Sequence, residues 1–183
     1  MKILLLVLAG LGALLLLTGG VHFSFQFGDA AASPVVQDLL AIQNATGATN
    51  IVTTRHRVFT LLRHASAIES HAGARVLRRS LPSAARLAAD EFARGREVIA
   101  AAPIKTRPGS TCRQAVLRLV ARSETLYRNL ADDAAAMRET WHAVRRFVVG
   151  AQAAMRSYSS DVQQCVAAAP PADRGPVERI MSA

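Results

Sequence analysis

The sequence predicts an all-α protein, in which an N-terminal membrane helix is followed by an up-and-down bundle of three to five helices. Hydrophobic residues make up 51% of the 183 residues, but aromatic residues only 5%. Ala, Leu and Val carry the apolar content, and the first two are strong helix formers. The chain also opens with a long uncharged run, and later apolar residues recur at three-and-four spacing, which is the period of a helix face.

The uncharged run extends from Ile3 to Val21, directly after Lys2. Its length is about that needed to cross a bilayer as a helix, whereas the apolar stretch of a signal peptide is usually shorter. We therefore expect residues 1–21 to be a membrane anchor, or a signal peptide if the chain is cleaved before Val21 or before Ser33.

Residues 22–32 are predicted to be a juxtamembrane linker. Phe23, Phe25 and Phe27 alternate with polar residues there, as expected for aromatic rings at a membrane interface. The only charge before the run is Lys2, so the positive-inside rule favours a single-pass plasma membrane protein with a cytoplasmic N-terminus and the bulk outside. If the run is cleaved, the protein is secreted.

Residues 33–168 are predicted to form the bundle. Ser33 followed by Pro34 is typical of a helix start, because the hydroxyl caps the helix and proline is tolerated at its first position. An apolar face of the first helix is predicted from Val35, Val36, Leu39, Leu40 and Ile42.

Two further helices are predicted from Asn50 towards Arg79 and from Ser83 to Ala101, separated at Pro82 and paired as a hairpin. Pro103–Ser110, with two prolines and a glycine, predicts a loop. Thr111 and Gln114 have the spacing of a capping box, which places the next helix start at Thr111.

The last helical region carries an unbroken heptad stripe, the pattern of a coiled coil. Leu119, Leu126 and Phe147 widen the stripe to a face that is more typical of a helix in a bundle. The stripe consists of Val116, Val120, Ser123, Tyr127, Leu130, Ala134, Met137, Trp141, Val144, Val148, Ala151, Met155, Tyr158, Val162 and Cys165.

Cys112 and Cys165 are the only cysteines, and export favours a disulfide between them. One continuous helix would hold them roughly 80 Å apart, so that an intrachain bridge requires the chain to fold back, near Asp132 or near Ser157. Both courses are open, and we predict the fold-back. Residues 169–183, rich in Pro and Gly, are predicted to be a disordered tail.

The net charge of +9 comes from arginine, since Lys2 and Lys105 are the only lysines. Guanidinium groups suit phosphates and carboxylates, and Arg75, Arg78 and Arg79 are the predicted anion-binding residues. Anionic lipid or an envelope polymer is the expected ligand class. Nucleic acid is not expected as a partner, because the N-terminal segment indicates an address outside the cytoplasm.

The sequence offers few residues for chemistry. Glu139 and His142 have the spacing of one half of a di-iron motif, but the second half is missing. His64 and His71 are seven residues apart, where metal ligands on a helix are usually three or four apart. We therefore expect no metal, no cofactor and no catalytic residues.

The leading functional hypothesis is a membrane-anchored, extracytoplasmic, non-enzymatic structural or interaction protein with a protein partner in the cell envelope. The alternative is an arginine-rich module that binds anionic lipid or envelope polymer.

Overall fold

The computed structural model describes residues 32–66, 70–136 and 140–182, and these residues form helices and no strands. The predicted all-α class is confirmed for them. The predicted anchor, residues 1–21, and all but the last residue of the linker lie outside the described part. No helix within that part has the length and apolarity needed to span a bilayer. The described elements are α2 (Pro34–Gly47), α3 (Ile51–Ser66), α4 (Ser70–Ala100), α5 (Arg107–Ala136), α6 (Thr140–Ala168), the 3-10 helix η1 (Pro171–Asp173) and α7 (Arg174–Ser182).

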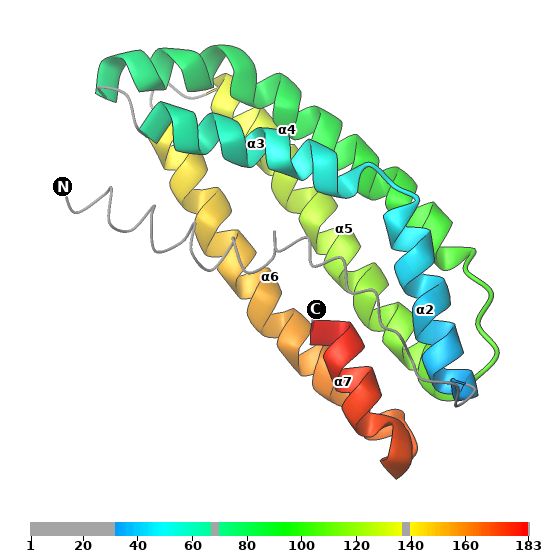
Figure 1. Ribbon diagram of the computed structural model, residues 1–183. Helices are drawn as coiled ribbons and strands as arrows, with labels where there is room; N and C mark the ends of the chain where they lie inside the picture. Colours follow the sequence, from blue (N-terminus) through cyan, green and yellow to red (C-terminus); the bar gives the residue numbers. More distant parts are fainter. Residues whose placement is uncertain (1–31, 67–69, 137–139, 183) are drawn as a thin grey trace.

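Consecutive long helices run antiparallel to one another. In Figure 1, α3 lies along α4, α4 along α5 and α5 along α6, whereas α2 covers one end of α4 and α5 and α7 folds back along α6. This arrangement is the up-and-down order expected when short connections join successive helices.

The bundle has two ends, here called the tip and the base. At the tip, α3 and α5 end and α4 and α6 begin. At the base, α2 and α5 begin and α4 and α6 end, close to α7 (Figure 1). Two contacts define the base: the Cys112–Cys165 disulfide joins α5 to α6, and Arg113 Nη1 donates to the carbonyl oxygens of Ala100 (3.0 Å) and Ala102 (3.1 Å) at the end of α4.

The core fills the space between the four long helices. Its centre is an aromatic row, in which the ring centroids of Phe92 and Tyr127 are 5.3 Å apart and those of Tyr127 and Phe147 are 5.0 Å apart. The row thus joins α4, α5 and α6. The largest aliphatic side chains with less than 2% exposure are Leu39, Val58, Leu77, Leu81, Ile99, Leu130, Val144 and Val177.

The first helix begins where the sequence predicted. Pro34 is its first residue, and Ser33 Oγ accepts a hydrogen bond from the amide of Val36 at 3.3 Å. Four of the five predicted apolar residues are buried, and Leu40 is half-buried.

The predicted division at Pro82 is wrong, because α4 continues through that proline. Leu77, Leu81 and Ala85 are completely buried on either side of it. Packing of these side chains outweighs the cost of about 3 kcal/mol that proline imposes inside a helix, and Figure 1 shows α4 changing direction in its first half. The predicted hairpin exists, but the chain reverses between Ser66 and Ser70.

The start of α5 was also predicted too late. Thr106 is the capping residue, since its hydroxyl oxygen accepts from the amide of Gly109 at 2.9 Å, and α5 begins at Arg107. The hydroxyl of Thr111, the predicted cap, instead donates to the carbonyl of Arg107 within the helix at 3.2 Å.

The heptad stripe holds through two helices instead of one. The chain reverses between Ala136 and Thr140, and each described member of the stripe is buried or half-buried. The predicted fold-back is confirmed, although at neither of the two places proposed for it. The alanine-rich sequence around the turn contains no proline or glycine that would mark a helix end. The four-three spacing of apolar residues also resumes after the turn, so this pattern alone does not locate the reversal.

The predicted disordered tail is wrong for residues 169–182. Prolines 170, 171 and 176 are placed before or at the starts of η1 and α7, where a missing amide costs little. Val177 and Met181 are buried, and Tyr158 of α6 donates its hydroxyl proton to the carbonyl of Met181 at 2.9 Å.

Candidate functional site

Asp38 of α2 is buried and binds the start of α5. Its Oδ1 accepts from the amide of Lys105 at 2.9 Å, and its Oδ2 accepts from the amide and the hydroxyl of Thr106 at 2.8 and 2.6 Å. Burial alone raises the pKa of Asp38, but these hydrogen bonds and the Lys105 charge outweigh it, and the pKa lies below its ordinary value. A Cβ at Gly109 would overlap this carboxylate, so the close approach requires glycine.

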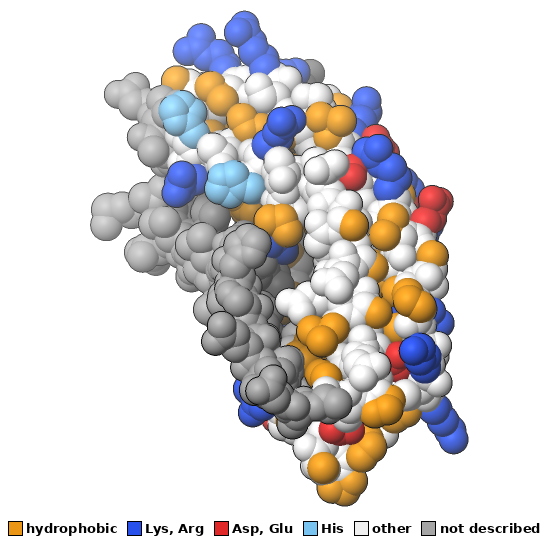
Figure 2. Space-filling model, turned by 45° about the vertical axis from the view of Figure 1, so that its right-hand side comes forward, with side chains coloured by type: hydrophobic (Ala, Val, Ile, Leu, Met, Phe, Trp, Pro, Cys, Tyr) orange, Lys and Arg blue, Asp and Glu red, His pale blue; other side chains and the backbone are white. Residues whose placement is uncertain are grey.

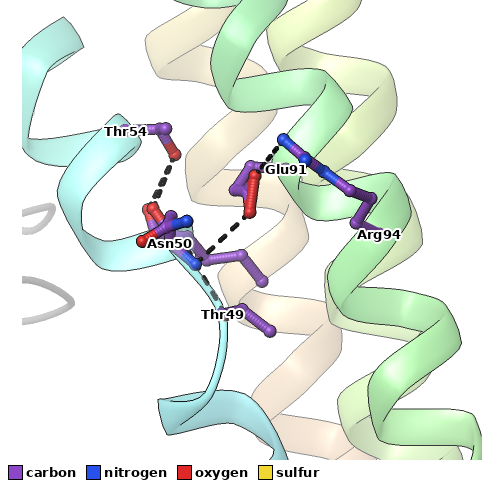
Figure 3. A network of polar contacts seen from close by, with 6 residues as sticks. Thr49, Asn50, Thr54, Glu91 and Arg94 are labelled. Carbon is purple, nitrogen blue, oxygen red and sulfur yellow. Dashed lines mark hydrogen bonds and ion pairs between the residues drawn. The ribbon is translucent and has the colours of Figure 1, made fainter.

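Glu91 of α4 is likewise a buried carboxylate that binds the start of a neighbouring helix, here α3. Figure 3 shows its carboxylate between two helices: Oε1 accepts from the amide of Asn50 at 3.4 Å, and Oε2 is paired with the guanidinium of Arg94. Thr54 closes the same turn, since its hydroxyl donates to the carbonyl of Asn50 at 3.0 Å. Glu91 therefore joins α4 to the first turn of α3.

The other two buried carboxylates form ion pairs with arginines. Asp161 of α6 forms ion pairs with two arginines of α5, Arg118 at 3.2 Å and Arg122 at 3.2 Å, and Arg122 also donates a hydrogen bond to it. Glu124 of α5 lies 3.0 Å from Arg128 on its own helix and 3.1 Å from Arg96 of α4. The contact with Arg96 is an ion pair by distance without the alignment of a hydrogen bond.

All four carboxylates that are buried in the described part of the chain thus bind groups of the bundle itself. The sequence carries a signal for Asp38, because this residue shares a helix face with the apolar residues Val35 and Ile42. Glu91, Glu124 and Asp161 each bind at least one group that lies on another helix. Sequence spacing alone does not reveal such contacts.

The predicted disulfide is confirmed: Cys112 and Cys165 are bonded, and both are completely buried. The bridge closes the α5–α6 hairpin at the base. Because Cα atoms of the two residues are 4.8 Å apart, the single long helix is excluded.

Arg75, Arg78 and Arg79, the predicted anion-binding residues, lie exposed in the first half of α4 at the tip. No ion pair joins them to an acidic residue of the described part. The outer face of the neighbouring α3 adds exposed basic side chains. Together these residues form the hairpin surface: His56, Arg57, Arg63, His64, Arg75, Arg78 and Arg79.

The hairpin surface lies in a stretch of chain with few acidic residues. Between Leu39 and Ala89 there are seven arginines, and Glu69 is the only acidic residue. Figure 2 shows several Lys and Arg side chains at the upper end of the molecule, with two histidines near them, while acidic and further basic side chains lie along the right-hand side and lower down. Three of these arginines are predicted from the sequence as anion-binding residues, whereas the shortage of acidic residues around them formed no part of that prediction.

The weaker candidates gain no support. His142 is exposed near the start of α6, and its predicted companion Glu139 lies outside the described residues, as does Glu69 near His64. In the described part, no three His, Cys, Asp or Glu side chains are arranged to hold a metal ion. A shallow depression between α6 and α7 is lined by Val162, Gln163, Val166, Ala167, Arg174 and Glu178.

No protein-family model, curated protein or solved structure matches the chain.

Proposed function

We propose that this protein is a non-enzymatic helical interaction module, held outside the cytoplasm by its N-terminal membrane anchor, with a protein partner in the cell envelope. The observation that carries the proposal is the buried Cys112–Cys165 bridge. Structural disulfides persist in oxidising compartments and are rare in the cytosol. The apolar run from Ile3 to Val21 is a second, independent reason to place the protein outside the cytoplasm.

The non-enzymatic part of the proposal is supported by the buried carboxylates. Each accepts backbone amides or guanidinium groups that belong to neighbouring turns and helices. Such groups stabilise the helix packing and have little freedom to exchange protons with a substrate.

Fractionation of the cells that make the protein tests the anchor. We expect the chain to stay with membranes after a carbonate wash, to keep its original N-terminus, and to migrate faster on non-reducing than on reducing gels. Mature protein that begins at Val21 or Ser33 would contradict the anchor.

Crosslinking before affinity purification tests the partner. A specific envelope protein is expected in the purified fraction. A freely diffusing pool from which no partner is recovered would contradict the interaction function.

A second candidate function is an arginine-rich module for anionic lipid or envelope polymer. The shortage of acidic residues from Leu39 to Ala89 favours it. Binding that relies on this charge weakens as ionic strength rises, and binding to anionic vesicles that is unaffected by salt would exclude it.

A further inference from the structure

We infer that the hairpin surface docks on the anionic phospholipid bilayer that holds the N-terminal segment, with the bundle lying lengthwise along the membrane. This inference rests on the proposed membrane anchor. It assigns a ligand class to the arginines of α3 and α4 and an orientation to the whole bundle.

Charge complementarity is the first step. Arginine binds phosphate through two parallel hydrogen bonds as well as by charge. Near an anionic membrane surface, each arginine strengthens adsorption about fivefold. The hairpin surface has five arginines, and Glu69 is the only acidic residue between Leu39 and Ala89.

The shape of the surface is the second step. Its arginines are exposed residues of two antiparallel helices, α3 and the first half of α4. The shallow depression between α6 and α7 lies at the other end of the bundle. A broad array of exposed guanidinium groups fits an extended plane of headgroups better than one enclosed small ligand.

The reach of the linker is the third step. Residues 22–32 span at most roughly 40 Å when extended, and they lead to Ser33 at the base. α4 is about 46 Å long at 1.5 Å per residue. A bundle standing on its tip would therefore place the base beyond the reach of the linker.

A bundle standing on its base is also unfavourable for the arginines. Arg75 and Arg79 would then lie roughly 30 to 40 Å above the bilayer, several Debye lengths of about 8 Å away. The lengthwise orientation keeps Ser33 near the anchor and brings the arginines to the headgroups. Of the three orientations, only this one meets both the length limit of residues 22–32 and the need for the arginines to lie near the headgroups.

The test uses the full chain reconstituted in vesicles of phosphatidylcholine, with or without phosphatidylglycerol, and a trace of phospholipid with a photoactivatable headgroup. We expect crosslinks on α3 and the first half of α4 in the phosphatidylglycerol vesicles. The triple variant Arg75→Gln, Arg78→Gln, Arg79→Gln should give on the order of 100-fold fewer, three factors of about five, and high salt should also lower their number. Mass spectrometry of the crosslinked peptides provides the measurement.

A matched control removes the same charge elsewhere. Arg145→Gln, Arg156→Gln and Arg179→Gln change exposed residues of α6 and α7 and should leave the crosslinks on α3 and α4 unchanged. An equal loss in both triple variants would overturn the inference.

Two other outcomes separate the inference from the proposal beneath it. If the chain resists a carbonate wash but its hairpin is not crosslinked, the anchor stands and the docking inference is wrong. If the chain washes off unlabelled, the anchor itself is wrong. Binding of soluble polyphosphate through the same three arginines, without lipid crosslinks, would assign the surface to a polymer and overturn the bilayer inference.

Discussion

At the residue scale, buried carboxylates act as fixed connections between helices. A buried charge without partners is strongly unfavourable, and removal of one partner of a buried pair is costly. Asp38, Glu91 and Asp161 each bind groups on a different element of the bundle. These contacts therefore favour one arrangement of the helices over alternatives in which a carboxylate would be buried alone.

Asp38→Asn should lower the free energy of unfolding by about 3 kcal/mol near neutral pH, because two amides and a hydroxyl lose a charged acceptor. The pKa of Asp38 is depressed in the folded protein, so its contribution is present above the ordinary value of 3.8 and is lost as pH falls below it. Urea unfolding at neutral and at acidic pH measures both effects.

The difference between wild type and Asp38→Asn should therefore shrink in acid. Asp90→Asn is the matched control, since Asp90 is exposed on α4 and surface changes usually alter stability by less than about 0.5 kcal/mol. Equal stability of the two variants at neutral pH would show that the Asp38 contacts contribute nothing.

At the element scale, the sequence predicted which residues are buried better than where helices end. The heptad stripe identified the inner face of α5 and α6 because burial follows helical periodicity. It did not identify the reversal after Ala136, since the same spacing continues on both sides. Pro82 predicted a break that tertiary packing overrides, and the prolines near α7 were interpreted as disorder although they lie where helices tolerate them.

The crossing of α3 and α4 depends on Gly73, because a Cβ there would overlap the backbone carbonyl of Ala65. Gly73→Ala should lower the free energy of unfolding by about 1 to 3 kcal/mol. Gly47→Ala is the opposite case, with open space around the added methyl group, and should raise it by up to about 1 kcal/mol. Thermal unfolding of both variants checks the contrast, and a stabilising Gly73→Ala would refute the close crossing.

The disulfide closes a loop between residues 53 positions apart. Replacing both cysteines by serine should lower the free energy of unfolding by about 4 kcal/mol, because the unfolded chain regains the entropy of that loop. Denaturant unfolding of the double variant, compared with the oxidised wild type, provides the measurement. A reductant-sensitive dimer on gels would contradict the intrachain bridge.

Val177→Asp should detach α7, because it places a charge at a completely buried position. We expect a loss of about 2 to 4 kcal/mol in unfolding free energy and rapid proteolysis after Ala169. Glu178→Gln, on the exposed side of α7, is the control. Unchanged stability of Val177→Asp would restore the interpretation of this segment as a disordered tail.

At the scale of the whole molecule, the two ends of the bundle differ in chemistry. The base contains the disulfide, the Asp38 contacts and α7, whereas the tip of the α3–α4 hairpin exposes arginine and histidine. Arg75, Arg78 and Arg79 could be predicted as exposed cations from helical periodicity. Their combination with Arg57 and Arg63 required the packing of α3 against α4, which local sequence patterns do not specify.

The protein contains two tyrosines, of which Tyr127 is buried and Tyr158 is half-buried. Burial raises the pKa of Tyr127 strongly, and burial together with Asp161 raises the pKa of Tyr158 to about 12. Since these folded-state values exceed the ordinary 10.0, the neutral phenols contribute stability that is lost as pH rises from about 10 through 12.

Phenolate absorbance of the native protein should therefore be absent near pH 10 and should appear together with the loss of helical circular dichroism. The chain in concentrated denaturant, which should titrate near its ordinary value, is the reference. One tyrosine that ionises near pH 10 while the helices persist would contradict its burial.

The consecutive order of the helices also bears on how the chain folds as it is made. Each long helix packs mainly against the next one along the sequence, and such local topologies form quickly. The contacts at the base are different, because they join residues far apart in the sequence. The hydrogen bonds of Asp38 require Thr106, and the disulfide of Cys112 requires Cys165, so neither forms until the later residue has been synthesised. A growing chain can therefore assemble its hairpins in the order in which they emerge, whereas oxidation, which takes seconds or longer, is expected to be the final and slowest event.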